Sequence, residues 1–283
     1  MKRIRFSKFL SAYLIIAAIV FFAGCASRSE KYGVQPFGAI GQEADVYVFA
    51  PVLGNRPFLH TLFTAFVPEE TAHQYLNRTS ALYIGVRYGA VPEITVSSAG
   101  SYPVSVSGLL FSQKDGWEKR RSASSAGTVY YYSQAADVVL QSKIAFALLG
   151  NNERNTEDFL QRIVVQREPV FPLRFRTLVE TGGEGEIGLY ARSGSRVASV
   201  LFGLQDMELP IRSIEVYLKK HTDVSYRYSA VFEAVNVRAA SILKRLLGTV
   251  LKGTFYVQES SVVVENADIS EAELIALFRS VVF

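Results

Sequence analysis

Few residues of this 283-residue chain combine the side chains and the spacing that catalysis requires. Residues 183–188 match G-x-G-x-x-G, the glycine pattern that lets a backbone approach a dinucleotide phosphate at the start of a helix. Here the residues that follow, IGLYARS, have the character of a strand, and Glu184 and Glu186 would repel the anion. We therefore predict a turn at this position and no cofactor-binding residue.

The histidines of the chain are His60, His73 and His221, and none has a partner at the spacing of a metal site. The chain also lacks a G-x-S-x-G serine elbow and a phosphate-binding G-x-x-x-x-G-K-[ST] loop. The sequence thus predicts no metal ligand and no catalytic residue, and hence a protein that is not an enzyme. Carboxylates that meet only in the folded chain, as in an unrecognised hydrolase, are the alternative that the sequence leaves open.

The one cysteine, Cys25, directly follows an apolar run. A basic head (Lys2, Arg3, Arg5 and Lys8) precedes the apolar residues 9–22, and Ala23 and Gly24 supply the small residues of a cleavage site, which is the layout of a secretory signal peptide. As a helix, residues 9–24 would extend only about 24 Å, against roughly 30 Å of hydrocarbon in a bilayer. The run is therefore too short to favour a membrane span.

The order Phe22-Ala23-Gly24-Cys25 resembles the lipobox of bacterial lipoprotein precursors. The resemblance covers residues 1–25, and the remaining chain shows no family motif. It implies that residues 1–24 are a signal peptide that is removed, and that Cys25 becomes a lipid-modified N-terminus carrying acyl chains such as palmitate. Two or more chains hold a protein stably on a membrane, because each buried methylene contributes about 0.8 kcal/mol. The resemblance thus implies a lipid anchor in the cell membrane or the outer membrane, facing the periplasm or the cell surface.

Removal of the signal peptide also changes the charge of the chain. The precursor has 30 basic and 26 acidic residues, and residues 1–24 carry four of the basic ones, so the mature chain has 30 − 4 = 26 of each and no formal net charge. A neutral body gives no support to a nucleic-acid partner. With no second cysteine, no disulfide forms within the chain, and packing must supply the stability.

The patterns beyond Cys25 predict a tether and a body. Residues 25–43 are rich in Ser, Gly and charge without apolar periodicity, which is typical of a flexible tether. Residues 44–166 are predicted to form a first αβ domain or half, 167–185 a linker with two prolines and a glycine cluster, and 186–283 a second αβ domain or half.

Apolar spacing predicts the elements of the body. Helical spacing is found at residues 56–66, from 68 onward, at 156–165, at 238–251 and from 270 to 281. Strand-like alternation is found at 44–52, through 81–149, in a hairpin at 214–232, and at 254–265. We therefore predict the α+β class, with an antiparallel sheet covered by helices on one face. A duplication of two αβ halves is one explanation of the recurring strand–helix order; the other is that αβ units look alike by pattern.

Aromatic side chains are the least ordinary feature of the body. Tyr130, Tyr131 and Tyr132 place large rings on both faces of one strand, and Trp117 lies on the preceding hairpin arm. One face can be core, and the other needs a cover, which is either a helix of the same chain or a bound ligand or protein. These four residues are the predicted binding surface. Two roles follow: a non-enzymatic protein-interaction or envelope-assembly module, or a carrier of a small apolar ligand.

Overall fold

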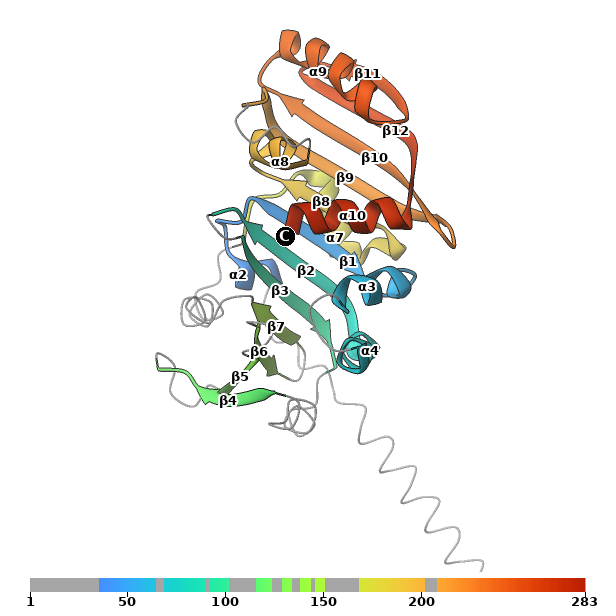
Figure 1. Ribbon diagram of the computed structural model, residues 1–283. Coiled ribbons are helices and arrows are strands. Elements are labelled where there is room, and N and C mark those ends of the chain that lie inside the picture. Colours follow the sequence, from blue (N-terminus) through green and yellow to red (C-terminus); the bar gives the residue numbers. More distant parts are fainter. Residues whose placement is uncertain are drawn as a thin grey trace, which may run out of the picture. The chain divides into compact units, whose positions relative to one another are not determined.

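One continuous antiparallel sheet runs through the body in the computed structural model (Figure 1), which confirms the predicted α+β class. The structure describes residues 36–64, 69–89, 92–101, 116–123, 129–133, 138–143, 146–150, 168–201 and 208–282. Residues 33–283 form one compact unit. Its strands follow the order β11-β12-β10-β9-β8-β1-β2-β3-β7-β6-β5-β4, and each pairing between these strands is antiparallel.

From the centre of the sheet, each arm begins with three strands in chain order and continues with later strands in reverse order. The first strands of the two predicted halves, β1 (Val46–Pro51) and β8 (Ile187–Ala191), pair with each other. On one side follow β2 (Thr79–Arg87), β3 (Glu93–Gly100), β7 (Phe146–Gly150) and β6 (Val138–Lys143), then β5 (Val129–Ser133) and β4 (Trp117–Arg121). On the other side follow β9 (Ile211–Thr222), β10 (Ser225–Ala234), β12 (Ser261–Ser270) and β11 (Thr254–Gln258). The arm that begins with β1 has two more strands, β5 and β4, than the arm that begins with β8. The duplication of two halves stays a prediction, and both halves share one sheet and one compact unit.

The central strand β1 is buried on both faces, so its alternate residues enter two different cores. Val46, Val48 and Ala50 belong to the larger cluster, and Tyr47 and Phe49 belong to a smaller aromatic cluster on the opposite face. A strand that is covered on both sides reads as a continuous apolar run, which is what VYVFAP shows.

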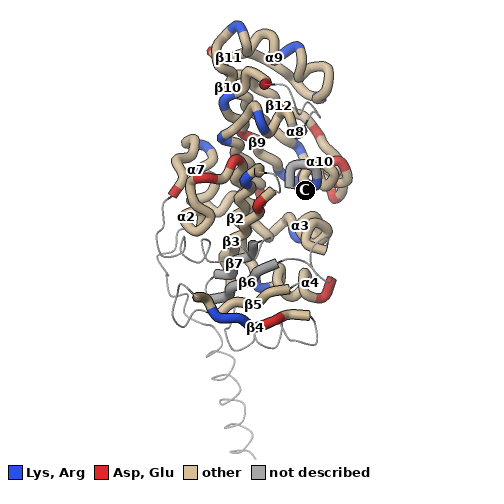
Figure 2. The backbone as a smooth tube through the Cα atoms, turned by 60° about the vertical axis from the view of Figure 1, so that its left-hand side comes forward, with Lys and Arg blue, Asp and Glu red and all other residues tan. Residues whose placement is uncertain are grey.

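The larger cluster is covered by helices α3 (Arg56–Phe63), α8 (Gly194–Leu201), α9 (Val237–Val250) and α10 (Glu271–Val282), which lie on one side of the sheet in Figures 1 and 2. The side chain of Asn236 caps α9 by accepting a hydrogen bond from the Ala239 amide. Ser270 and Glu273 form the predicted capping box of α10: the Ser270 amide and hydroxyl donate to the Glu273 carboxylate, and the Glu273 amide donates to the Ser270 hydroxyl.

The opposite face also carries helices, which the sequence did not predict. Helix α2 (Pro36–Ile40) and helix α7 (Leu173–Thr181) cover the aromatic cluster, where the rings of Phe37, Phe171 and Phe175 lie 4.9–5.8 Å from one another. Residues 36–40, expected in the flexible tether, are therefore part of the folded body. Residues 173–181, expected as a strand-like piece of a linker, form a helix instead, because Phe175 and Leu178 share one face that packs on the sheet.

Two further differences concern local chain direction. The stretch predicted as one strand at 254–265 is a hairpin, because Glu259 adopts a left-handed φ of 53° and reverses the chain between β11 and β12. The G-x-G-x-x-G stretch forms the predicted turn: Gly183 and Gly185 both have positive φ, and a strand, β8, follows in place of a helix. The helix predicted at 156–165 lies outside the described residues.

Candidate functional site

The predicted aromatic surface is buried. Trp117, Tyr130, Tyr131 and Tyr132 are 3–9 % exposed, and they lie on β4 and β5 at one edge of the sheet. Arg120 stacks on the ring of Tyr132, with the guanidinium carbon 4.3 Å from the ring centre. These rings therefore expose little surface, and a binding role for these four residues stays a prediction. Cys25 lies outside the described residues.

An apolar groove of about 470 Å³ lies elsewhere, on the face of the sheet that carries the larger core cluster. Its floor is formed by inward-facing residues of β1, β2, β8, β9, β10 and β12, and its walls by α8, α10 and the end of α9. This volume is within the range of roughly 300–1,000 Å³ that is usual for small-molecule sites. The lining consists of Val46, Val48, Val86, Leu189, Val197, Ile214, Val216, Leu218, Tyr228, Ala230, Phe232, Val250, Leu251, Ile269, Leu274, Leu277 and Phe278.

Short side chains on part of the floor and the end of α9 leave the space of the groove. Val48, Val216 and Ala230 have short side chains that do not reach far above the sheet. Helix α9 ends at Val250, and Leu251 continues in an extended conformation with a φ of −111° and a ψ of 149°. Helix α10 crosses the sheet separately from α9 and packs on α3, where the rings of Phe58 and Phe278 lie 5.5 Å apart (Figure 1).

The mouth of the groove is marked by lining residues that reach solvent. Val250 on α9 and Leu277 on α10 are 55 % and 39 % exposed, although both line the groove. Val250 also ends a stripe of exposed apolar residues, with Ile242 and Leu246, at intervals of four along the outer side of α9. Four basic residues lie on the same helix or directly after it: Arg238, Lys244, Arg245 and Lys252. Apolar surface is therefore continuous from the groove to the outside of α9.

Among the described residues that line the groove, Tyr228 has the only polar side chain. Its hydroxyl donates to the carbonyl oxygen of Lys252 at 3.3 Å, at the point where the chain leaves α9. Burial raises the pKa of this phenol, so the group stays neutral at physiological pH. The described lining is therefore suited to binding an apolar chain.

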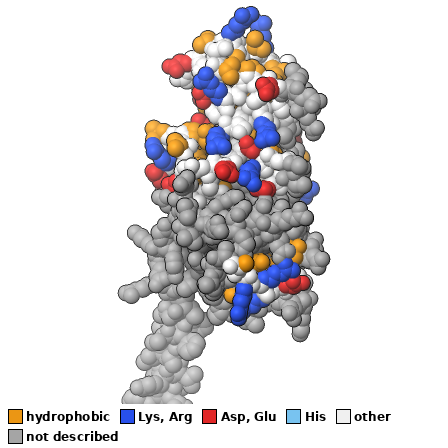
Figure 3. All heavy atoms as spheres, turned by 90° about the vertical axis from the view of Figure 1, so that its left-hand side faces the viewer, with side chains coloured by type: hydrophobic (Ala, Val, Ile, Leu, Met, Phe, Trp, Pro, Cys, Tyr) orange, Lys and Arg blue, Asp and Glu red, His pale blue; other side chains and the backbone are white. Residues whose placement is uncertain are grey.

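Charge on the described surface is mixed. On the side drawn in Figure 3, basic and acidic side chains are interspersed, and the edge strand β4 carries Glu118 beside Lys119, Arg120 and Arg121 (Figure 2).

No described helix is long and apolar enough to cross a membrane. Among the described residues, no group of three or more His, Cys, Asp or Glu side chains is placed to hold a metal ion.

The sequence predicted the strands of the groove floor and two of its helices, α9 and α10, but neither helix α8 nor the groove itself. The alternation at 214–232 and the apolar faces of 238–251 and 270–281 were visible in the sequence. Whether those faces close on one another or leave a space depends on the angles between the helices, and no local pattern encodes those angles.

Comparison with known proteins places the whole body in one group. The family described as "Outer membrane-associated lipoprotein TP0453" matches residues 31–275 of this chain. The protein described as "Outer membrane protein TP0453", from Treponema pallidum (strain Nichols), is 26 % identical over 269 residues, which cover 94 % of this chain and 92 % of the relative.

Solved structures of TP0453 have the same fold. Crystal form I superposes with a TM-score of 0.76 at 25 % identity, covering 89 % of this chain and 100 % of the other. Crystal form III gives a TM-score of 0.75 at 24 % identity, covering 87 % and 98 %.

Proposed function

The chain belongs to the family of the outer membrane-associated lipoprotein TP0453, and from this premise we propose that it is a lipid-anchored carrier that holds an acyl chain in the groove. The family supports an envelope lipoprotein at the membrane. The proposed anchor is Cys25, because it ends a lipobox-like sequence. The carrier role is the finer part of the proposal, and the groove is the observation that supports it.

The size of the groove suits one acyl chain. A methylene group has about the volume of a water molecule, ~30 Å³, so 470 Å³ corresponds to on the order of 15 methylene groups. The valine-rich lining matches such a chain chemically, and each methylene moved from water into it contributes about 0.8 kcal/mol. Of the two roles that the sequence suggested, the groove favours the carrier over the assembly module. The apolar lining also favours a body that is not an enzyme.

The outer side of α9 suits exchange of the ligand with a membrane. An apolar stripe flanked by Lys and Arg is the pattern of a helix that lies at a lipid interface. Because Val250 belongs to both the stripe and the groove, contact of α9 with a bilayer would bring the mouth of the groove to the lipid. We expect Ile242→Ser and Leu246→Ser to weaken binding of the unlipidated chain to anionic vesicles.

The test uses a chain without its lipid anchor, so that no detergent competes for the groove. The compact unit at 33–283 has its own core, so we expect residues 26–283 to fold alone. A fatty acid with an environment-sensitive fluorophore should bind once per chain, and the freshly purified protein should show extra native mass that disappears on denaturation. Ala230→Phe should fill the groove and weaken probe binding at least tenfold.

The control comes from the next residue on the same strand. Val231 does not line the groove, because successive side chains of a strand point to opposite faces, so Val231→Phe adds an aromatic ring without entering it. Both variants should keep the circular dichroism spectrum of the parent chain. Equal probe binding by both variants, or no saturable binding by the parent chain, would reject the groove as the ligand site.

The anchor is tested separately. In a bacterium that processes lipoproteins, the full precursor should incorporate a labelled palmitate analogue, and Cys25→Ala should abolish this labelling and leave residues 1–24 uncleaved. Labelling of the Cys25→Ala variant would contradict the proposed anchor without affecting the groove.

A further inference from the structure

Two histidines that the sequence left apart face each other across a helix pair. His60 lies on α3 and His73 on α4 (Glu69–Arg78), and their ring centres are 6.3 Å apart at an interplanar angle of 79°. His60 is half-buried and His73 is exposed. Among the described residues, the ring nitrogens of His60 and His73 have no hydrogen-bond partner. A lone pair of each ring is therefore available to a ligand.

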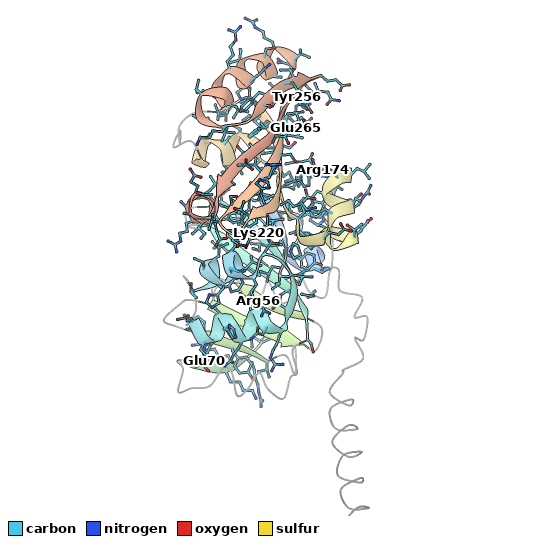
Figure 4. The ribbon with its side chains drawn as sticks, turned by 90° about the vertical axis from the view of Figure 1, so that its right-hand side faces the viewer. Arg56, Glu70, Arg174, Lys220, Tyr256 and Glu265 are labelled. Carbon is cyan, nitrogen blue, oxygen red and sulfur yellow. The ribbon has the colours of Figure 1, made fainter. Side chains whose placement is uncertain are left out.

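The helices that carry these rings are joined by contacts before and after His60 on α3, whose partners on α4 all follow His73. One turn before His60, Arg56 donates to the Asn77 side chain and, at 3.1 Å, to the carbonyl oxygen of Leu76 at the end of α4. Figure 4 shows Arg56 on α3, beside α4, which is marked by Glu70. Beyond the histidines, the rings of Phe63 and Tyr75 stack at 5.3 Å.

The inner faces of both helices are anchored in the core. Phe58 and Leu59 of α3, and Ala72 and Leu76 of α4, are at most 1 % exposed. The separation between His60 and His73 is therefore fixed by packing rather than by the two imidazoles themselves.

We propose that His60 and His73 together form a surface site for a divalent transition-metal ion, with Cu²⁺ bound most tightly. Neutral imidazole is a ligand for Cu²⁺, Ni²⁺ and Zn²⁺, and Cu²⁺ binds most tightly in this series. Two imidazoles on opposite sides of one ion have ring centres about 6.4 Å apart, from two metal–nitrogen bonds of ~2.0 Å and about 1.2 Å within each ring. The observed distance of 6.3 Å between the ring centres is close to this value.

The site supplies two ligands, so water or a small anion completes the coordination of the ion. This site is independent of the groove and of the carrier role.

The test is a titration of the mature full-length lipoprotein in non-ionic detergent with Cu²⁺ alone, at pH 7.5 in a non-coordinating buffer. Electron paramagnetic resonance should show coupling of the first equivalent to two nitrogens. Each of His60→Ala and His73→Ala should weaken this equivalent at least tenfold.

The third histidine provides the control. His221 is also exposed, and its Nε2 lies 2.9 Å from the Arg227 guanidinium, so it is not paired with another imidazole. His221→Ala should leave the Cu²⁺ affinity unchanged, and all three variants should unfold at the same temperature as the parent without metal. Equal affinity in His60→Ala and His221→Ala, or loss of the site in His221→Ala, would overturn the proposal.

Discussion

Replacement of Asn55 by alanine should destabilise the body far more than its small size suggests. Asn55 is fully buried after β1, where its amide nitrogen donates to the carbonyl oxygens of Pro51 at 3.0 Å and Gly185 at 2.9 Å. Its side-chain oxygen accepts from the hydroxyl of Tyr226, which is also fully buried, at 3.1 Å. Asn55 therefore joins the loop after β1 to the turn before β8 and to β10.

The expected cost follows from the groups that lose their partner. Asn55→Ala leaves one buried hydroxyl and two carbonyl oxygens without this side chain, and an unsatisfied buried polar group costs about 1–3 kcal/mol. Since a carbonyl oxygen can keep a second partner, we expect a loss of about 2–5 kcal/mol in the free energy of unfolding. Urea unfolding followed by circular dichroism should show a lower midpoint with an unchanged slope.

A double-mutant cycle tests the cause. Tyr226→Phe removes the hydroxyl that Asn55→Ala would strand, so the double variant should lose less stability than the sum of the two single variants, by at least about 0.5 kcal/mol. Asn77→Ala, at an exposed site, should cost less than about 1 kcal/mol. Strictly additive losses, or an Asn55→Ala variant as stable as the parent, would refute this account.

Three further predictions concern single positions. Gly188→Ala should cost about 1–3 kcal/mol in urea unfolding, because its Cβ would lie 2.5 Å from Leu178 on α7, and equal stability would show that α7 shifts freely. Gly248→Ala should instead stabilise the body by about 0.5–1 kcal/mol in the same assay, because alanine favours a helix more than glycine does and nothing lies within 4 Å of the added Cβ. A loss of stability would contradict the assignment of this residue to helix α9. Hydrogen bonds from Ser270 hold the pKa of Glu273 below its usual value, so this carboxylate stabilises the fold above the unfolded pKa of about 4.5 and the effect is lost as the pH falls through the folded pKa. Glu273→Ala should therefore destabilise the body at pH 7 but much less at pH 3, and an equal loss at both values would exclude the charged cap.

Local patterns determined most elements of the body. Helix α9 follows from its amphipathic spacing, and α10 from the capping box of Ser270 and Glu273, because both signals depend only on residues three or four positions apart. The lipobox-like sequence before Cys25 is likewise complete within 25 residues, so the envelope assignment needed no fold.

Tertiary structure alone decided what those elements enclose. Helix α7 was missed because its short apolar face becomes meaningful only against the aromatic cluster on the second face of the sheet. Pairing of β1 with β8 joins residues some 140 positions apart, and no local signal specifies that choice. The groove and the meeting of His60 with His73 have the same origin: the sequence sets which faces are apolar or polar, but the distances between those faces are fixed only when all the helices pack on one sheet.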